Sequence, residues 1–271
     1  MWVDAICINQ EDLNERAQQV TAMGDIYAKA QGVLVWLGPK SELDYKAFDT
    51  MSLLCSRFPN STHDALGLEN FEMHGGSASL EVNSQILEAL VKNPSPEIDA
   101  THISHMLLRP WFERTWIIQE VARASRVRFI CGNSQMEWET FLGAFDIYVG
   151  IALYLLIPST LRKAVSGAIS NLTAIRKCRN EALEPPASVF ERLCWARNFK
   201  ATDPRDKLYA ILGLVQHPEL KITPDYHARF RDIFKGFAVT NMVDNRDLRL
   251  LSCASGFAQV SEHELPSWVP D

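Results

Sequence analysis

Residues 2–8 read Trp-Val-Asp-Ala-Ile-Cys-Ile and residues 33–37 read Val-Leu-Val-Trp-Leu, two short apolar runs. The first run ends in a polar turn, and Gly38 ends the second. Short apolar runs with such boundaries are typical of strands that are buried on both faces of a sheet. Between them, apolar residues recur at helical spacing from Leu13 to Tyr27, which predicts a helix with one face toward a core. We therefore predict a strand–helix–strand unit with parallel strands, the start of an α/β fold.

The rest of the chain extends this fold with one more strand and many helices. A helix is predicted at 111–124 and a strand at 127–131, whereas residues 60–79 carry few apolar anchors and are expected to form a loop. We predict an α/β class in which residues 1–138 form a small, mostly parallel sheet flanked by helices. Residues 139–271 are predicted to form a largely helical part that packs on this core.

Composition and charge exclude several classes of protein. The chain has 271 residues, of which 47% are hydrophobic, enough to bury a sizeable core and to exclude wholesale disorder. Lys and Arg number 27 against 33 Asp and Glu, a formal net charge of −6, which disfavours nucleic acid as a partner. The longest apolar stretch, residues 149–157, is far shorter than a membrane span, and no signal peptide opens the chain. We expect a cytoplasmic protein with no membrane span.

The sequence contains no recognisable metal or cofactor motif. Its six cysteines lie far apart without a Cys-x-x-Cys pair, which argues against a disulfide scaffold and against a zinc site. His102 and His105 lie three residues apart, but no suitable third ligand is near them. Glycine-rich nucleotide motifs and the usual hydrolase motifs are also missing. We therefore predict no resident cofactor and no metal.

Four segments, taken in order, carry a family resemblance. They are residues 2–10 with Glu15-Arg16 and the run 33–38, residues 109–120 (Arg-Pro-Trp-Phe-Glu-Arg-Thr-Trp-Ile-Ile-Gln-Glu), residues 203–213 (Asp-Pro-Arg-Asp-Lys-Leu-Tyr-Ala-Ile-Leu-Gly), and residues 223–226 (Thr-Pro-Asp-Tyr). Together they resemble the heterokaryon incompatibility (HET) domain of filamentous fungi. The resemblance implies a role in fungal non-self recognition, in which fusion of incompatible hyphae leads to programmed cell death. It also implies protein partners or self-association.

The HET family usually begins with a further strand and helix upstream of the Trp-Val-Asp segment. Because this sequence starts at that segment, we expect the α/β core of residues 1–138 to lack both elements. A non-catalytic signalling or assembly module and an inactive, truncated HET fragment are therefore alternatives to an enzyme.

A more distant similarity, to TIR (Toll/interleukin-1 receptor) domains, suggests a chemistry. TIR domains carry a Trp-x-x-x-Glu pair on a helix, and Trp116 and Glu120 have this spacing, which places both side chains on one helix face. The similarity implies that Glu120 corresponds to the glutamate with which enzymatic TIR domains cleave NAD⁺ at its nicotinamide–ribose bond. A carboxylate placed there favours the oxocarbenium character that develops on the ribose. NAD⁺ is thus implied as a possible substrate, and Glu120 as the candidate catalytic residue.

Four further residues are candidates for substrate binding or have a plainer role. Asn9 and Gln10 follow the first predicted strand, where α/β sheets bind ligands, but side chains there also cap turns. Trp116 either stacks on a ligand or packs in the core. Arg114 either contacts substrate or pairs with a carboxylate such as Glu120, which is itself either catalytic or an ordinary surface glutamate. If Glu120 is catalytic, it should line a cleft with Asn9 or Gln10.

The charged residues of the motifs also predict a structural polar network. Asp4 lies inside an apolar run, so its carboxylate needs a cation such as Arg114 or Arg205. A helix is predicted to start at residues 203–206, since Asp caps helices and an acid complements the dipole in the first turn. The predicted network consists of Asp4, Arg16, Asp203, Arg205 and Asp206.

Overall fold

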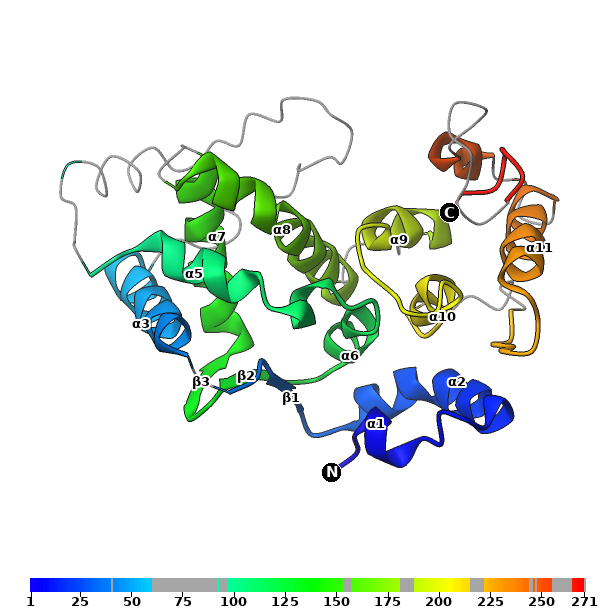
Figure 1. Ribbon diagram of the computed structural model, residues 1–271, viewed down its shortest axis with the longest axis horizontal. Coiled ribbons are helices and arrows are strands. Elements are labelled where there is room, and N and C mark those ends of the chain that lie inside the picture. Colours follow the sequence, from blue (N-terminus) through cyan, green and yellow to red (C-terminus); the bar gives the residue numbers. More distant parts are fainter. Residues whose placement is uncertain are drawn as a thin grey trace. The chain divides into compact units, whose positions relative to one another are not determined.

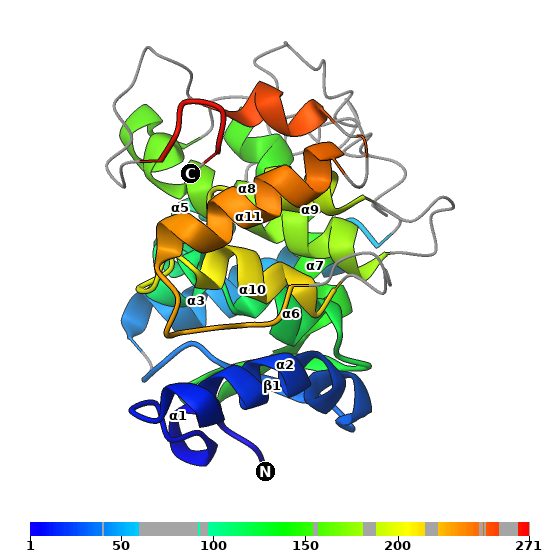
Figure 2. The same ribbon diagram turned by 90° about the vertical axis from the view of Figure 1, so that its right-hand side faces the viewer.

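The computed structural model describes residues 1–39, 41–59, 92, 97–153, 157–180, 188–214, 222–243, 246, 248–254 and 265–270 (Figures 1 and 2). The predicted loop at residues 60–79 lies outside these ranges. Two compact units make up the chain, each built from segments far apart in the sequence. The first unit comprises Met1–Gln31, Glu113–Ser125 and Ser170–Asp271, and the second comprises Gly32–Phe112 and Arg126–Ile169. The predicted boundary between residues 138 and 139 stays a prediction.

The second unit contains the three strands of the described chain. β1 (Val33–Trp36) pairs in parallel with β2 (Val127–Cys131), and β2 pairs antiparallel with β3 (Ser134–Glu137). The predicted strands at residues 33–37 and 127–131 and the mixed α/β class are confirmed. The sheet is mixed rather than mostly parallel, because a tight turn at Gly132, whose φ is 55°, returns the chain directly beside β2.

Aromatic side chains fill the core of the second unit. Phe112, Phe129 and Phe141 are fully buried and stack on one another, with the ring centroids of Phe129 and Phe141 4.1 Å apart. Helices pack around them, and Figure 1 shows these helices side by side. They are α3 (Glu42–Arg57), α5 (Ala100–Leu107) and α7 (Trp138–Leu153). Arg109 then fixes the end of β1 by donating to the carbonyl oxygens of Leu37 and Pro39.

The first unit is helical. Its elements are α1 (Asp4–Cys7), α2 (Leu13–Lys29), α6 (Ile117–Ala122), α9 (Val189–Ala196), α10 (Asp206–Leu212), α11 (Phe230–Val243) and the 3₁₀ helix η4 (Arg249–Cys253), while α8 (Ser159–Arg179) and η3 (Pro110–Glu113) belong partly to each unit. The short helix α10 packs on α2, α6 and α9, as Figures 1 and 2 both show. No helix in the described ranges has the length and apolarity that crossing a membrane requires.

The predicted strand at residues 2–8 is wrong, because Asp4–Cys7 form the helical turn α1. This turn satisfies its backbone locally: the N–H of Cys7 donates to the carbonyl oxygen of Val3 at 2.8 Å. If these residues formed a strand, their backbone N–H and C=O groups would need a neighbouring strand as hydrogen-bond partner. Asp4 in the first turn also suits the helix dipole, and none of the four side chains is buried. The parallel partner of β1 is therefore β2 and not residues 2–8.

The predicted helix at 111–124 is confirmed only in its second half, α6, because the segment is divided into η3 and α6. The backbone of Lys200 interrupts it: its N–H donates to the carbonyl oxygen of Glu113 at 2.6 Å, and its carbonyl accepts the N–H of Thr115 at 2.9 Å. These groups are thereby unavailable for a continuous ladder of helical hydrogen bonds. A distant segment thus decides where α6 begins.

Two glycines allow α2 and α10 to approach each other closely. A Cβ atom on Gly24 of α2 would lie 3.0 Å from the carbonyl oxygen and 3.2 Å from the Cα of Gly213, directly after α10. The fully buried side chain of Gln119 from α6 lies against both glycines. The helices α2, α6 and α10 therefore meet at a point where Gly24 and Gly213 leave little room for a side chain.

Replacing Gly24 with alanine is expected to destabilise the protein by about 1–3 kcal/mol, since the new methyl group meets backbone atoms. Gly236 in α11 is the matched control, because nothing lies within 4 Å of a Cβ there. Gly236→Ala should stabilise the protein by about 0.5–1 kcal/mol. Urea unfolding followed by circular dichroism measures both changes, and equal effects of the two substitutions would contradict the close approach.

Candidate functional site

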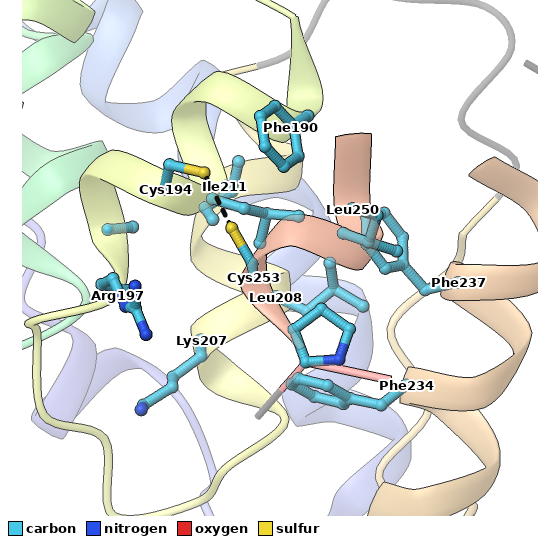
Figure 3. Close-up of a pocket in the computed structure, with 13 residues that line it drawn as sticks. Phe190, Cys194, Arg197, Lys207, Leu208, Ile211, Phe234, Phe237, Leu250 and Cys253 are labelled. Carbon is cyan, nitrogen blue, oxygen red and sulfur yellow. Dashed lines mark hydrogen bonds between the residues drawn. The ribbon is translucent and has the colours of Figure 1, made fainter. Parts of the chain in front are cut away.

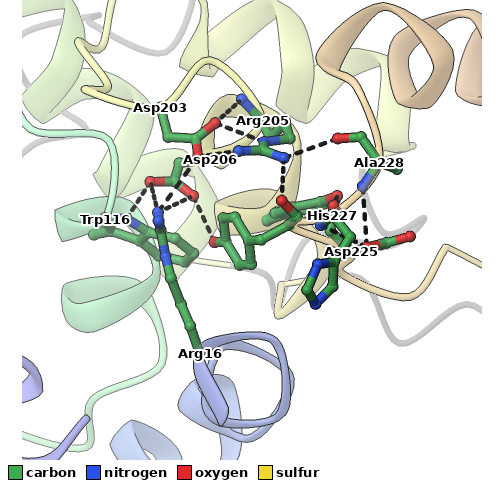
Figure 4. Close-up of polar contacts among 10 residues, drawn as sticks. Arg16, Trp116, Asp203, Arg205, Asp206, Asp225, His227 and Ala228 are labelled. Atoms are coloured by element: carbon green, nitrogen blue, oxygen red, sulfur yellow. Dashed lines mark hydrogen bonds and ion pairs between the residues drawn. The ribbon is translucent and has the colours of Figure 1, made fainter. Parts of the chain in front are cut away.

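The buried carboxylate of Asp206, at the start of α10, collects donors from three other segments (Figure 4). Its Oδ2 accepts the indole N–H of Trp116 at 3.2 Å and lies 3.2 Å from Nη2 of Arg16. Its Oδ1 accepts the hydroxyl of Tyr226 at 2.6 Å. A buried carboxylate requires such donors to offset its loss of hydration. The four sequence segments that carry the family resemblance therefore meet at one side chain.

A second layer of contacts fixes Tyr226. The guanidinium carbon of Arg16 lies 3.8 Å from the centroid of its ring, within cation–π range. Arg205 makes a bidentate pair with Asp203, at 2.9 and 2.8 Å, and also donates to the carbonyl oxygens of Tyr226 at 2.7 Å and Ala228 at 2.8 Å. Asp203 in turn accepts the backbone N–H of Arg205 at 3.1 Å. The predicted capping by Asp203 is wrong, because α10 begins at Asp206 with Arg205 at its N-cap position and no side-chain cap.

The charges of this network shift the pKa values of its acids in opposite directions. Burial raises the pKa of Asp206, although the Tyr226 hydrogen bond and Arg16 oppose the rise. Burial acts in the same sense on Asp203, but its hydrogen bonds with Arg205 outweigh burial and lower the pKa. Burial and the neighbouring Asp206 raise the pKa of the Tyr226 hydroxyl, which stays protonated and donates.

An open cleft of about 440 Å³ lies beside this network in the first unit. It is within the usual size of small-molecule sites. Six of the ten predicted site residues line the cleft, namely Asp4, Gln10, Arg16, Arg114, Trp116 and Asp206. The other four, which are Asn9, Asp203, Arg205 and Glu120, do not line the cleft. The cleft is lined by one aromatic residue, Trp116, and by charged residues of both signs.

Glu120 does not line the cleft and is only 9% exposed. Burial raises the pKa of Glu120 to about 7; Arg114 acts to lower it and Asp4 to raise it further. Its backbone N–H donates to the carbonyl oxygen of Trp116 at 3.1 Å, so both residues occupy one helical turn. The interpretation of Glu120 as a surface glutamate is wrong. The expected cleft contains Gln10 but not the Glu120 side chain.

The remaining candidates lie at the surface. Asp4 does meet Arg114, at 3.8 Å, but the side chains are 31% and 51% exposed, so the pair contributes little to stability. The buried carboxylate expected at Asp4 is absent because residues 2–8 form no buried strand. Asn9 caps a turn: its side chain accepts the N–H of Glu11 at 3.2 Å, and its own N–H donates to Glu15 at 3.0 Å.

Tyr226 is the functional residue that the sequence interpretation missed. Its only signal was its place at the end of the Thr-Pro-Asp-Tyr motif, which gives no hint that its hydroxyl reaches Asp206. Among the residues that the structure describes, no group of three metal-ligating side chains is assembled.

Comparisons with known proteins show what the chain is similar to. The family described as "Heterokaryon incompatibility protein (HET)" matches residues 1–120. The whole chain is also similar, at 27% identity over 307 aligned residues, to "Heterokaryon incompatibility protein 6, OR allele" from Neurospora crassa. The chain spans 44% of the length of that relative. No solved structure matches the chain.

The segment that matches the HET family model, residues 1–120, contributes two of the three donors around Asp206. Arg16 and Trp116 lie inside residues 1–120, whereas Asp206 and Tyr226 lie beyond them, in the part of the chain that aligns with the Neurospora protein. The network thus joins the matched HET segment to the C-terminal part of the chain within the first unit.

Removing the Asp206 carboxylate is expected to destabilise the protein, because the donors around it lose their acceptor. Asp206→Ala removes the closest acid of Arg16 and the acceptor of the Trp116 and Tyr226 hydrogen bonds. Loss of one partner of a buried ion pair lowers the free energy of unfolding by about 3–5 kcal/mol. Asp232→Ala, in the exposed pair with Arg229, should leave stability close to that of the wild type. Urea unfolding measures both, and a small effect at Asp206 would contradict its central place.

Titration of Glu120 is expected to make stability fall as pH rises. Its pKa is raised from 4.5 to about 7 by burial, so the folded state binds more protons than the unfolded state between these values. Relative to Glu120→Gln, the wild type should lose about 2–3 kcal/mol between pH 5 and pH 8. Glu191 is the control: its pKa is lowered by the Ser188 N–H, so Glu191→Gln should give a constant difference over this range. A flat profile for Glu120 would contradict its burial.

Proposed function

We propose that this chain belongs to the HET family and acts in fungal heterokaryon incompatibility, in the cytoplasm, and that its output is the death of fused, incompatible cells. The observation that carries the proposal is the convergence on Asp206 of Arg16, Trp116 and Tyr226, one from each of the other family segments. Such convergence is expected of segments that are kept together to build one working module. The names of the matching family and of the Neurospora relative support the same role.

The proposed mode of action is protein recognition, through partners or self-association. Both carboxylate oxygens of Asp206 are already occupied by donors from the chain itself. This network is therefore a structural support for the surface around it and offers no free acid for chemistry. A rigid module that presents a surface is what an assembly role requires.

Glu120 favours a second candidate function, cleavage of NAD⁺. Its carboxyl group has a pKa of about 7, and the two charged residues that influence it, Arg114 and Asp4, both line the cleft. A buried carboxyl group with a pKa near neutrality beside a cleft is a common feature of catalytic sites. Stabilisation of a cationic ribose needs the ionised form, so the rate should rise with pH up to about 8. Glu120 would need to reach the cleft, which it does not line here.

Expression of the full chain in a filamentous fungus tests the proposed role. The wild type should arrest growth and kill hyphal compartments, as a vital dye reports, whereas Asp206→Ala should not, because it removes the support of the module. Asp232→Ala should behave as the wild type. Normal growth with the wild-type chain at full expression would contradict the proposal.

The variant Glu120→Gln separates the two modes of action in the same experiment. It keeps the shape of the side chain and removes its negative charge, so a protein-recognition module should kill as before. An NAD⁺-cleaving enzyme should lose killing together with nicotinamide release from purified protein. Nicotinamide release that is unchanged by Glu120→Gln would remove Glu120 from the proposed chemistry.

A further inference from the structure

Two cysteines far apart in the sequence face each other in the first unit (Figure 3). The Sγ atoms of Cys194, in α9, and Cys253, in η4, lie 3.2 Å apart, and both thiols are free. A disulfide requires about 2.05 Å between the sulfur atoms, so they must approach by about 1.2 Å. Small rotations of the two side chains supply this movement, because both residues are at the edge of a pocket and not locked in a packed core.

The surroundings of the pair leave it accessible to a small oxidant. Both cysteines are partly exposed, and they line a small pocket whose walls are mostly apolar. Leu208 and Ile211 of α10 form part of the same pocket, as Figure 3 shows. The pair therefore adjoins the helix whose first residue, Asp206, is the centre of the polar network.

We propose that Cys194 and Cys253 are an oxidation site, at which hydrogen peroxide converts the two thiols into an intramolecular disulfide. Neither residue belongs to the motifs that carry the family resemblance or to the polar network. The site is thus independent of the proposed function and of the NAD⁺ chemistry.

The reaction balances with peroxide as the sole oxidant. The thiolate of Cys253 attacks one peroxide oxygen, the O–O bond breaks, and the products are a sulfenic acid and one water after proton transfer. The thiolate of Cys194 then attacks the sulfenic sulfur, which forms the S–S bond and releases the second water. The two sulfur atoms together lose two electrons, which the peroxide gains, and both thiol protons end in water.

The order of the two steps follows from the thiolate content of Cys194. Burial, together with Cys253 itself, raises the pKa of Cys194 to about 12, so its thiolate is scarce at neutral pH. This disfavours Cys194 as the thiol that meets the peroxide. In the second step the reaction is intramolecular, and the short Sγ–Sγ distance compensates for the low thiolate fraction.

The bond would join η4 to α9 across a loop of 59 residues. A cross-link of this length restricts the unfolded chain and therefore stabilises the folded one. Because α9 packs on α10, the bond should also slow opening of α10. Oxidation would thus tighten the part of the unit on which the Asp206 network is built.

Peroxide treatment of the purified full chain tests the site. Thiol titration in denaturant should show the loss of two of the six thiols, and peptide mapping without reductant should find residues 194 and 253 cross-linked. The melting temperature should rise by about 5–10 °C and return on reduction. Amide exchange in α10 should slow on oxidation.

Two variants make the result specific. Cys253→Ser should show neither the cross-link nor the rise in melting temperature, whereas Cys7→Ser, which removes an exposed thiol, should show both. Retention of all six thiols in the wild type, under conditions that oxidise a small free thiol, would overturn the proposal. So would a cross-link between other cysteines that persists in Cys253→Ser.

Discussion

The first unit depends on the need to neutralise one buried carboxylate. Asp206 is 5% exposed, and a charge in that position is tolerated only when donors surround it. Arg16, Trp116 and Tyr226 supply them from three separate segments. Since each donor has to reach the same two oxygens, the segments that carry the donors are held in a fixed arrangement. Gly24 and Gly213 permit this arrangement at the other end of α10, where a larger side chain would push α2 away.

The sequence allowed prediction of elements whose signals are local. The runs at 33–37 and 127–131 are strands as expected, because continuous apolar residues between turn signals leave few alternatives. Residues 2–8 have the same pattern and form a helical turn, since the pattern does not report whether a partner strand is available. The break before α6 was equally invisible, because the backbone of Lys200 causes it from a distant segment.

In the candidate site, too, local patterns were predictable from the sequence and contacts between distant segments were not. Charge patterns indicated that Arg16, Asp203, Arg205 and Asp206 act together, and the structure does bring them together. They did not indicate Tyr226, because an aromatic side chain in a short motif gives no direction for its hydroxyl. Trp116 and Glu120 share a helical turn but differ in their surroundings: the indole N–H donates to Asp206, whereas Glu120 is buried and does not line the cleft.

The long sequence separation within the Asp206 network has a consequence for synthesis of the chain. Arg16 and Asp206 are 190 residues apart, so α2 leaves the ribosome well before its acid partner exists. At about 5–20 residues per second, this wait lasts about 10–40 s. During that time the apolar face of α2, with Val20 and Met23, has no α10 to cover it. The nascent chain is therefore expected to depend on chaperones until α10 has been translated.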